Sequence, residues 1–322
     1  MGRGVIGNTT DFDSVIVGSN PAAPAKTRGG IFVQKIKIAC TSSGGLDPMT
    51  AKALDIDIIP ILIEYQGKQY REGLDLDPNA FFRQLEVTAP DRYNLPKTVV
   101  PTAEATQQVV EKAISRGFTD IIFVCMSTNL GSAFNKIRVD SQPYEDQVNL
   151  HYVDTKAIGY VEAYLALRAG CMAMQHESVE AILAELEQIR LNSYTIGGCT
   201  NLDYPVYNGR LKGAQAFWGR TLRICPTLEV THNGELVNIA KALHKAKAYE
   251  SAALHIQKHL QDCDNYLLWR FHTGKDNEKY LARAEKKLGL VPNAPDVTMP
   301  LSTGVHTGPT LAGWGLIKLE NS

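Results

Sequence analysis

Apolar runs of strand length alternate with amphipathic stretches along the first half of the chain. The apolar runs span residues 36–40, 121–126 and 148–153, and each is followed by polar residues. Stretches 102–116 and 179–191 carry apolar residues at helical spacing. This strand–helix alternation predicts right-handed crossover connections and a mostly parallel sheet.

A hairpin is predicted inside this alternation. Residues 58–65 have the pattern of a strand, Gln66-Gly67 that of a tight turn, and residues 68–71 that of the returning strand. Asp77 and Pro78 then fit the cap and the first position of a helix.

The pattern changes after Asn192, where strands become short and helices fewer. An Asn233-Gly234 pair predicts an antiparallel hairpin turn. We therefore predict an α/β protein with a parallel α/β domain over residues 36–192 and a smaller α+β domain over residues 193–322, whose sheet is mixed or antiparallel. The second domain is expected to contain strands at 194–197, 227–230, 266–271 and 316–319 and helices at 238–260 and 277–288.

Residues 1–35 differ from the rest, because Gly, Ser, Asn, Thr and Ala dominate there, and they predict a disordered N-terminal extension. Acidic Asp11 and Asp13 do not fit a secretory signal. The tetrapeptide Gly18-Ser19-Asn20-Pro21 can be encoded by the sequence of a tRNA T-arm. We therefore expect that Met1 lies upstream of the true start, which N-terminal sequencing of the native protein would test.

Composition excludes several classes of protein. A formal net charge of −1 lacks the excess of positive charge that is typical of nucleic-acid-binding proteins. No apolar run approaches the roughly 18 residues of a membrane span. The six cysteines form no C-x-x-C pair and no zinc-ligand spacing. We expect reduced thiols, a cytoplasmic location, and neither a metal nor a cofactor.

Hydroxyl-rich segments follow three of the predicted strands. They are Thr41-Ser42-Ser43, Ser127-Thr128-Asn129 and Asp154-Thr155-Lys156, and a fourth small-polar segment, 304–309, carries His306. In parallel α/β sheets, ligands bind beyond the carboxyl ends of the strands, where the strand order reverses. Hydroxyls gathered there without an acid–base pair predict a binding site for a polar head group.

Motifs along residues 36–319 resemble, in order, those of the DegV family of bacterial fatty-acid-binding proteins. The match is strongest at H-T-G-P (306–309), which is identical to the family motif. The other matching segments are C-T-S-S-G-G-L-D-P (40–48), Y-Q-G-K-Q-Y-R-E-G (65–73), L-P-K-T-V-V-P-T (95–102), M-S-T-N-L-G-S-A-F (126–134), H-Y-V-D-T-K (151–156) and N-L-D-Y-P-V-Y-N-G-R-L-K-G-A (201–214).

The resemblance implies a DegV-like two-domain architecture with an acyl chain buried between the domains. It implies that Thr98, Ser127 (or Thr128) and His306 hold the carboxylate, and it makes Arg210 a candidate contact for a phosphate or a partner. A separate fatty acid kinase catalytic subunit is the implied partner, which would form acyl-phosphate from ATP. The supporting polar loops would be Thr41, Ser42, Ser43, Thr307 and Gly308.

The residues themselves leave alternatives open. Serine and threonine after a strand are commonly caps or turn formers, His306 fits a plain loop residue, and Arg210 fits a solvated surface. Ser127 and His306 could instead form an acyl hydrolase or transferase, and the replacement of Ser-Gln by Val99-Val100 leaves room for another amphiphile. Candidate residues for the tail site are Ile58, Ile61, Ile63, Phe81, Phe82, Phe217, Trp218, Leu222 and Ile224.

Overall fold

The computed structural model describes residues 34–88, 93–209, 224–261, 263–274 and 277–319. The N-terminal extension through residue 33 and Arg210 lie outside these residues, so their predictions stay untested. The predicted disorder does not reach Lys35, because its backbone N–H donates to Thr119 Oγ1 at 2.9 Å.

The first half of the chain forms a four-stranded parallel sheet in the order β2-β1-β6-β7. Its strands are β1 (Ile36–Thr41), β2 (Ile56–Ile59), β6 (Asp120–Cys125) and β7 (Asn149–Asp154). All six residues of β1 and of β6 are buried, as expected for central strands that are covered on both faces. The predicted parallel sheet is confirmed.

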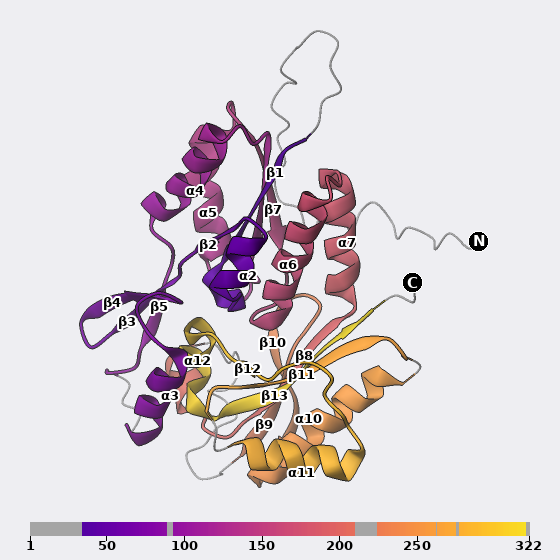
Figure 1. Cartoon of the computed structure of the whole chain (residues 1–322). Coiled ribbons are helices and arrows are strands. Elements are labelled where there is room, and N and C mark those ends of the chain that lie inside the picture. The colour runs from indigo at the N-terminus through magenta and orange to yellow at the C-terminus, as the bar shows by residue number, and fades with distance from the viewer. Residues whose placement is uncertain (1–33, 89–92, 210–223, 262, 275–276, 320–322) are drawn as a thin grey trace.

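Helices cover both faces of this sheet (Figure 1). One face packs against α4 (Ala103–Ser115) and α5 (Ala133–Ser141). The other packs against α2 (Pro48–Ala53), α6 (Tyr160–Met174) and α7 (Val179–Leu191). Strands β1 and β6 are neighbours in space, although they are distant in sequence, and the strand order reverses between them. A ligand site is therefore expected beyond the carboxyl ends of β1 and β6.

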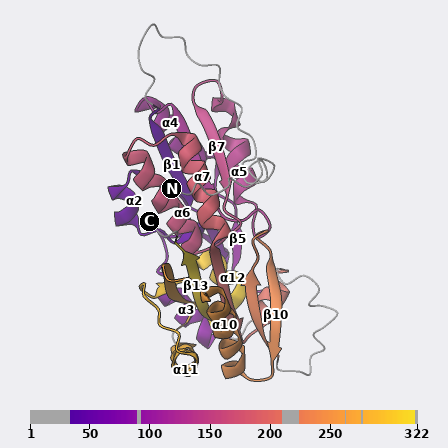
Figure 2. The same ribbon diagram turned by 90° about the vertical axis from the view of Figure 1, so that its right-hand side faces the viewer.

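The second half forms a six-stranded mixed sheet in the order β10-β9-β8-β13-β11-β12. Helices α10 (Lys245–Leu260) and α11 (Glu278–Leu288) cover one of its faces, and the other face is turned toward the parallel sheet (Figure 2). The strands are β8 (Ser193–Cys199), β9 (Cys225–Val230), β10 (Leu236–Ala242), β11 (Tyr266–His272), β12 (Val297–Thr298) and β13 (Leu311–Lys318). Only the pairing of β11 with β12 is parallel among these. Strand β8 begins at Ser193, and the domain boundary near that residue stays a prediction.

Two predicted elements are wrong in detail. The single strand at 58–65 is interrupted at Pro60, which separates β2 of the parallel sheet from β3 (Leu62–Tyr65). The helix predicted from 238 begins only at Lys245, because residues 236–242 form β10 and pair with β9 across the Asn233-Gly234 turn. That turn is a hairpin, as predicted.

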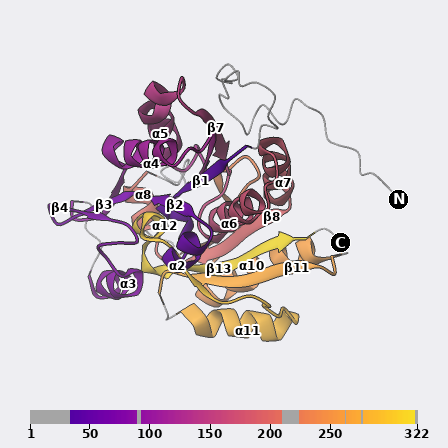
Figure 3. The same cartoon turned by 45° about the horizontal axis from the view of Figure 1, so that its top comes forward.

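A third, three-stranded antiparallel sheet has the order β4-β3-β5. Strands β4 (Lys68–Arg71) and β5 (Lys97–Val99) both pair with β3. The following helix α3 (Pro78–Val87) is capped as predicted, since the Asp77 carboxylate accepts from Ala80 N at 2.7 Å. Figure 3 shows this sheet and α3 at one edge of the molecule, with α12 (Leu301–Thr307) on their inner side.

Helix α12 joins the two halves of the chain. Its Leu301 and Val305 belong to the same apolar cluster as Phe81 and Phe82 of α3. A Cβ at Gly304 would lie 2.0 Å from Phe82 Cε1, so only glycine permits this approach. The remaining short helical elements among the described residues are α8 (Asp203–Tyr207) and the 3₁₀ turns Ser42–Gly44, Gln142–Tyr144 and Gly308–Thr310. Within the described residues, no helix is long and apolar enough to span a membrane.

Candidate functional site

Thr98 and His306 meet although they are more than two hundred residues apart in sequence. Thr98 lies on the edge strand β5, and its Oγ1 is 3.0 Å from His306 Nε2. His306 belongs to α12 rather than to a loop, which corrects the plain-loop interpretation. The packing of α12 against α3 therefore fixes the imidazole opposite the threonine hydroxyl.

A small cavity, here called the head cavity, opens at this pair. It contains about 440 Å³ of space between atoms, part of it continuous with solvent. None of the described residues that line it is a lysine or an arginine, so its polar groups are hydroxyls and an imidazole. The lining residues are Ile61, Thr98, Val99, Val100, Met126, Leu130, Gly131, Ser132, Ala133, Ser302 and His306.

A second cavity, here called the tail cavity, lies between the six-stranded sheet and the loops that follow β6 and β7. It contains about 630 Å³ of space between atoms, part of it continuous with solvent. Met126, Leu130 and His306 line both cavities, so His306 stands where a polar compartment meets an apolar one. The other lining residues are Ile158, Thr195, Gly197, Leu228, Val230, Leu236, Phe271, Met299, Thr303, Thr307 and Leu311.

Ser127 is not among the described residues that line the head cavity or the tail cavity. Its hydroxyl donates to the Gly234 carbonyl at 2.8 Å and accepts from Asn129 N at 3.2 Å. Asn129 Nδ2 donates to the neighbouring Asn233 carbonyl at 2.8 Å. These bonds, here called the hairpin latch, hold the β9–β10 turn against the loop after β6.

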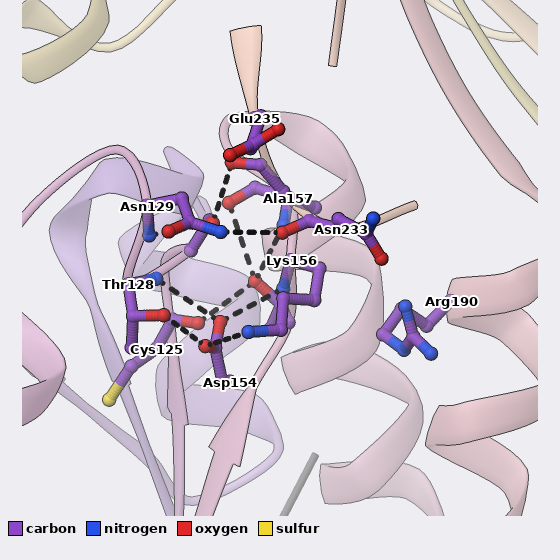
Figure 4. A network of polar contacts seen from close by, with 12 residues as sticks. Cys125, Thr128, Asn129, Asp154, Lys156, Ala157, Arg190, Asn233 and Glu235 are labelled. Atoms are coloured by element: carbon purple, nitrogen blue, oxygen red, sulfur yellow. Dashed lines mark hydrogen bonds and ion pairs between the residues drawn. The ribbon is translucent and has the colours of Figure 1, made fainter. Parts of the chain in front are cut away.

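The Thr128 hydroxyl hydrogen-bonds to Asp154, the last residue of β7 (Figure 4). Thr128 Oγ1 donates to Asp154 Oδ2 at 2.6 Å, and Lys156 Nζ lies 2.7 Å from the same oxygen. Figure 4 shows Thr128 and Lys156 converging on this carboxylate, with Asn129 reaching across to Asn233. The structure therefore brings Thr98 and His306 together, and it engages Ser127 and Thr128 elsewhere.

The segment Thr41-Ser42-Ser43 lies next to the head cavity, because its hydroxyls accept from the backbone N–H groups of Met126 and Ile61. It also binds two buried glutamates. Ser43 Oγ donates to Glu162 Oε2 at 2.8 Å, and Thr41 Oγ1 donates to the same carboxyl. Ser42 Oγ donates to Glu72 Oε2 at 2.6 Å. These hydroxyls serve as internal partners of carboxyl groups, and their role as supporting loops of a ligand site stays a prediction.

Glu162 and Glu72 were not found from the sequence, although one signal was present. Glu162 lies in the first turn of α6, within a helix that is otherwise nearly all apolar. Burial raises the pKa of the Glu162 carboxyl to about 8, and the nearby Glu72 adds to the rise. Glu162 is therefore largely protonated near neutral pH, so it places no full negative charge near the head cavity.

Ser302 is a further residue that sequence reasoning missed. It is buried, it lines the head cavity beside Thr98 and His306, and its backbone N–H donates to Glu72 Oε1 at 2.6 Å. Burial raises the pKa of Glu72, and hydrogen bonds from Ser42 and Ser302 oppose that rise. A serine one helical turn before a candidate ligand histidine was the available signal.

Thr307 and Gly308 hold the end of α12. Thr307 Oγ1 donates to the Thr303 carbonyl at 3.1 Å, and the Gly308 carbonyl accepts from Thr273 Oγ1 at 2.7 Å. Gly308 has φ +69°, and a Cβ there would lie 2.3 Å from Tyr204 Cδ2. Both residues therefore position the helix that carries His306.

All of the predicted tail residues that the structure describes fall outside the tail cavity. Ile61 lines the head cavity, whereas Ile63, Phe81 and Phe82 belong to the core beneath α12. Ile58 lines a separate cavity beside α2. Phe217, Trp218 and Leu222 lie outside the described residues, and Ile224 is not among the lining residues.

Comparisons with known proteins identify related sequences and related folds. A family model described as uncharacterised protein, DegV family, matches residues 35–319. A DegV domain-containing protein of Clostridium acetobutylicum is 24% identical over 292 residues, which cover 89% of this chain and all of that protein. The fold is similar to a fatty acid binding DegV family protein from Streptococcus agalactiae, with a TM-score of 0.78 and 19% identity over 89% of this chain and 100% of that one.

It is also similar to DegV, a fatty acid binding protein from Bacillus subtilis, with a TM-score of 0.75 and 20% identity over 89% of this chain and 100% of that chain. The likeness to these structures shows the two-sheet fold, and the family model covers nearly all of the residues described here. This chain belongs to the DegV family.

Proposed function

We propose that this protein binds a long-chain fatty acid, with the carboxylate in the head cavity and the acyl chain in the tail cavity. The observation that carries the proposal is the position of His306, which lines both cavities and lies 3.0 Å from Thr98 Oγ1. An amphiphile with one polar end and one long apolar end fits two such compartments.

The tail supplies most of the binding free energy in this proposal. Burial of a methylene group contributes about 0.8 kcal/mol, so a dozen methylenes contribute on the order of 10 kcal/mol before the costs of association. The apolar walls formed by Leu228, Leu236 and Phe271 are suited to that burial.

The head group limits which amphiphile can bind. A buried carboxylate must be hydrogen-bonded, because an unpaired anion in an apolar site is costly. Thr98 and His306 can donate to it, and Ser302 lies in the same cavity. Neutral donors favour a carboxylate over a phosphate head group, because the latter carries more charge and is usually met by lysine or arginine.

The known relatives support the same ligand class. The solved DegV proteins from Streptococcus agalactiae and Bacillus subtilis are described as fatty acid binding. Their fold matches this chain over its described length, so a comparable cavity between the two sheets is expected here.

The proposal extends to delivery of the bound acid to a separate ATP-dependent fatty acid kinase subunit. The sequence has no G-x-x-x-x-G-K-[ST] motif, so the groups for phosphoryl transfer would come from that partner. This protein would be the substrate-presenting component, without catalytic machinery of its own. Its free cysteines fit the cytoplasmic location that this role requires.

A serine hydrolase is less well supported. Ser127 Oγ donates to a backbone carbonyl, whereas a nucleophilic serine would donate to a histidine. A carboxylate role for Ser127 or Thr128 stays a prediction, and it would require their hydroxyls to leave Gly234 and Asp154.

Native mass spectrometry of protein purified without added ligand tests the proposal. A co-purifying mass of a long-chain fatty acid is expected for the wild type and for a control variant, Thr88→Val, whose exposed threonine donates to the Gln84 carbonyl. The bound fraction should fall in Thr98→Val. A ligand that is no fatty acid, or equal occupancy in all three proteins, would contradict the assignment.

The delivery step needs a separate test. The fatty-acid-loaded protein is mixed with ATP and a fatty acid kinase subunit from the same organism, and acyl-phosphate is trapped with hydroxylamine. Formation of the hydroxamate only when both proteins are present supports the presenting role, and formation by this protein alone would contradict it.

A further inference from the structure

One threonine hydroxyl in the wall of the tail cavity has no structural partner. Thr303 is only 6% exposed and lines the cavity, and its Oγ1 has no hydrogen-bond partner among the residues that the structure describes. A buried hydroxyl left in this state destabilises the fold, because it has lost its hydrogen bonds to water. Valine has the same shape without that cost, so packing alone does not explain a threonine at this position.

The usual internal partner of a helical threonine is not used by Thr303. A helical threonine commonly bonds back to the carbonyl four residues earlier, but α12 begins at Leu301, so the carbonyl of Met299 lies before the helix. Thr307, on the same helix, does make that bond, donating to the Thr303 carbonyl at 3.1 Å. The hydroxyl of Thr303 therefore differs from its neighbour in having its donor and acceptor unused.

The position of Thr303 along the cavity follows from the helix. Thr303 precedes His306 by three residues, so the two side chains share one face of α12 with their Cβ atoms about 5–6 Å apart. His306 marks the junction of the head and tail cavities. Thr303 therefore lies beside the first few carbons of a chain whose carboxylate is held at His306.

We infer that the preferred ligand is an acyl chain oxygenated near its carboxylate, with a hydroxyl or oxo group on one of the first few carbons that hydrogen-bonds to Thr303 Oγ1. This inference rests on the proposed function and narrows its substrate class. A hydroxyl on the ligand can donate to or accept from Thr303, and an oxo group can accept from it. A plain hydrocarbon chain offers neither.

Calorimetric titration of delipidated protein with palmitic acid, 2-hydroxypalmitic acid and 3-hydroxypalmitic acid, the hydroxy acids as separate enantiomers, tests the inference. One hydroxy acid is expected to bind wild type about three- to tenfold more tightly than palmitic acid, the range for one additional neutral hydrogen bond. In Thr303→Val the ratio of the two affinities should fall to about one. Thr303→Ser keeps a hydroxyl and should keep the preference.

Thr195→Val is the matched control, because Thr195 lines the same cavity but lies on β8 instead of α12. It should leave the ratio as in wild type. Equal binding of all acids by wild type, a preference that survives Thr303→Val, or a preference removed by Thr195→Val would each overturn the inference. So would an equal loss for plain and hydroxy acids in Thr303→Val, which would place Thr303 at the head group. Failure of wild type to bind any of these acids would instead overturn the proposed function.

Discussion

Ser127 Oγ donates to the Gly234 carbonyl across 2.8 Å, which joins the loop after β6 to the turn between β9 and β10. The two residues come from different halves of the chain. Strands β9 and β10 supply Leu228, Val230 and Leu236 to the wall of the tail cavity. The hairpin latch therefore holds one wall of that cavity against the parallel sheet.

Removal of this latch should loosen the hairpin. In Ser127→Ala the buried Gly234 carbonyl loses its donor, at a cost of about 1–3 kcal/mol. Hydrogen–deuterium exchange of the amides in residues 228–236 should become faster, because opening of the hairpin becomes easier. Ser115→Ala removes an exposed hydroxyl that donates to the Lys112 carbonyl and should leave these amides unchanged. Unchanged exchange in Ser127→Ala would show that the bond does not hold the hairpin.

The close approach of Gly234 to Ser127 can be tested by substituting the glycine. Gly234 has φ +77°, and a Cβ there would lie 2.1 Å from Ser127 Oγ. Gly67, at the tip of the other hairpin, has φ +73° with nothing within 4 Å of the added atom. Gly67→Ala should cost about 1–2 kcal/mol from the backbone conformation alone. Gly234→Ala should lower the free energy of unfolding by clearly more, and equal losses in urea denaturation would argue against the close approach.

The buried Glu162 carboxyl makes stability depend on pH. Its pKa is raised from 4.5 to about 8, so between these values the folded protein binds more protons than the unfolded chain. The contribution of this carboxyl to the free energy of unfolding should therefore be largest below about pH 4.5 and fall as pH rises toward 8, by at most about 1.4 kcal/mol per pH unit.

Glu162→Gln replaces the protonated acid with a neutral group of the same shape and should remove this part of the pH dependence. Denaturant unfolding at several pH values compares the two proteins. Parallel curves for wild type and Glu162→Gln would mean that Glu162 titrates normally in the folded state.

The tail cavity can be shortened by one substitution. Leu236 is half-buried and lines the cavity from β10, so Leu236→Trp should displace the space of about two methylenes. That loss corresponds to roughly tenfold weaker binding of palmitic acid, whereas octanoic acid should be affected less. Leu243→Trp changes a leucine that is 66% exposed and serves as the control. Equal effects on both acids, measured by calorimetry, would contradict the assignment of the tail.

The sequence pattern was sufficient for the parallel sheet. Strands β1, β6 and β7 are short apolar runs followed by polar residues, and such runs are readable locally. The pairing of Thr98 with His306 came from the family resemblance, because no local pattern relates a strand residue to a helix two hundred residues later.

Other features depend on contacts that the sequence does not display. Residues 236–242 form a strand because β9 offers them a partner, although they continue directly toward the helical stretch of α10. Segment 301–307 contains Gly304 and precedes Gly308-Pro309, so it resembles a loop, yet packing against Phe82 stabilises a helix. The residues that line the tail cavity occupy alternate positions on strands of the second sheet. They could be assigned only once it was known which face of that sheet is turned toward the cavity.

The claim that Thr98 and His306 hold a carboxylate is tested most directly by comparing palmitic acid with hexadecanol, which has the same chain and no charge. Calorimetry of wild type and Thr98→Val should show that the variant binds the acid about tenfold or more weakly, as expected for loss of a charge-assisted hydrogen bond, while the affinity for the alcohol changes much less. Equal changes for acid and alcohol, or no change for the acid, would contradict the account.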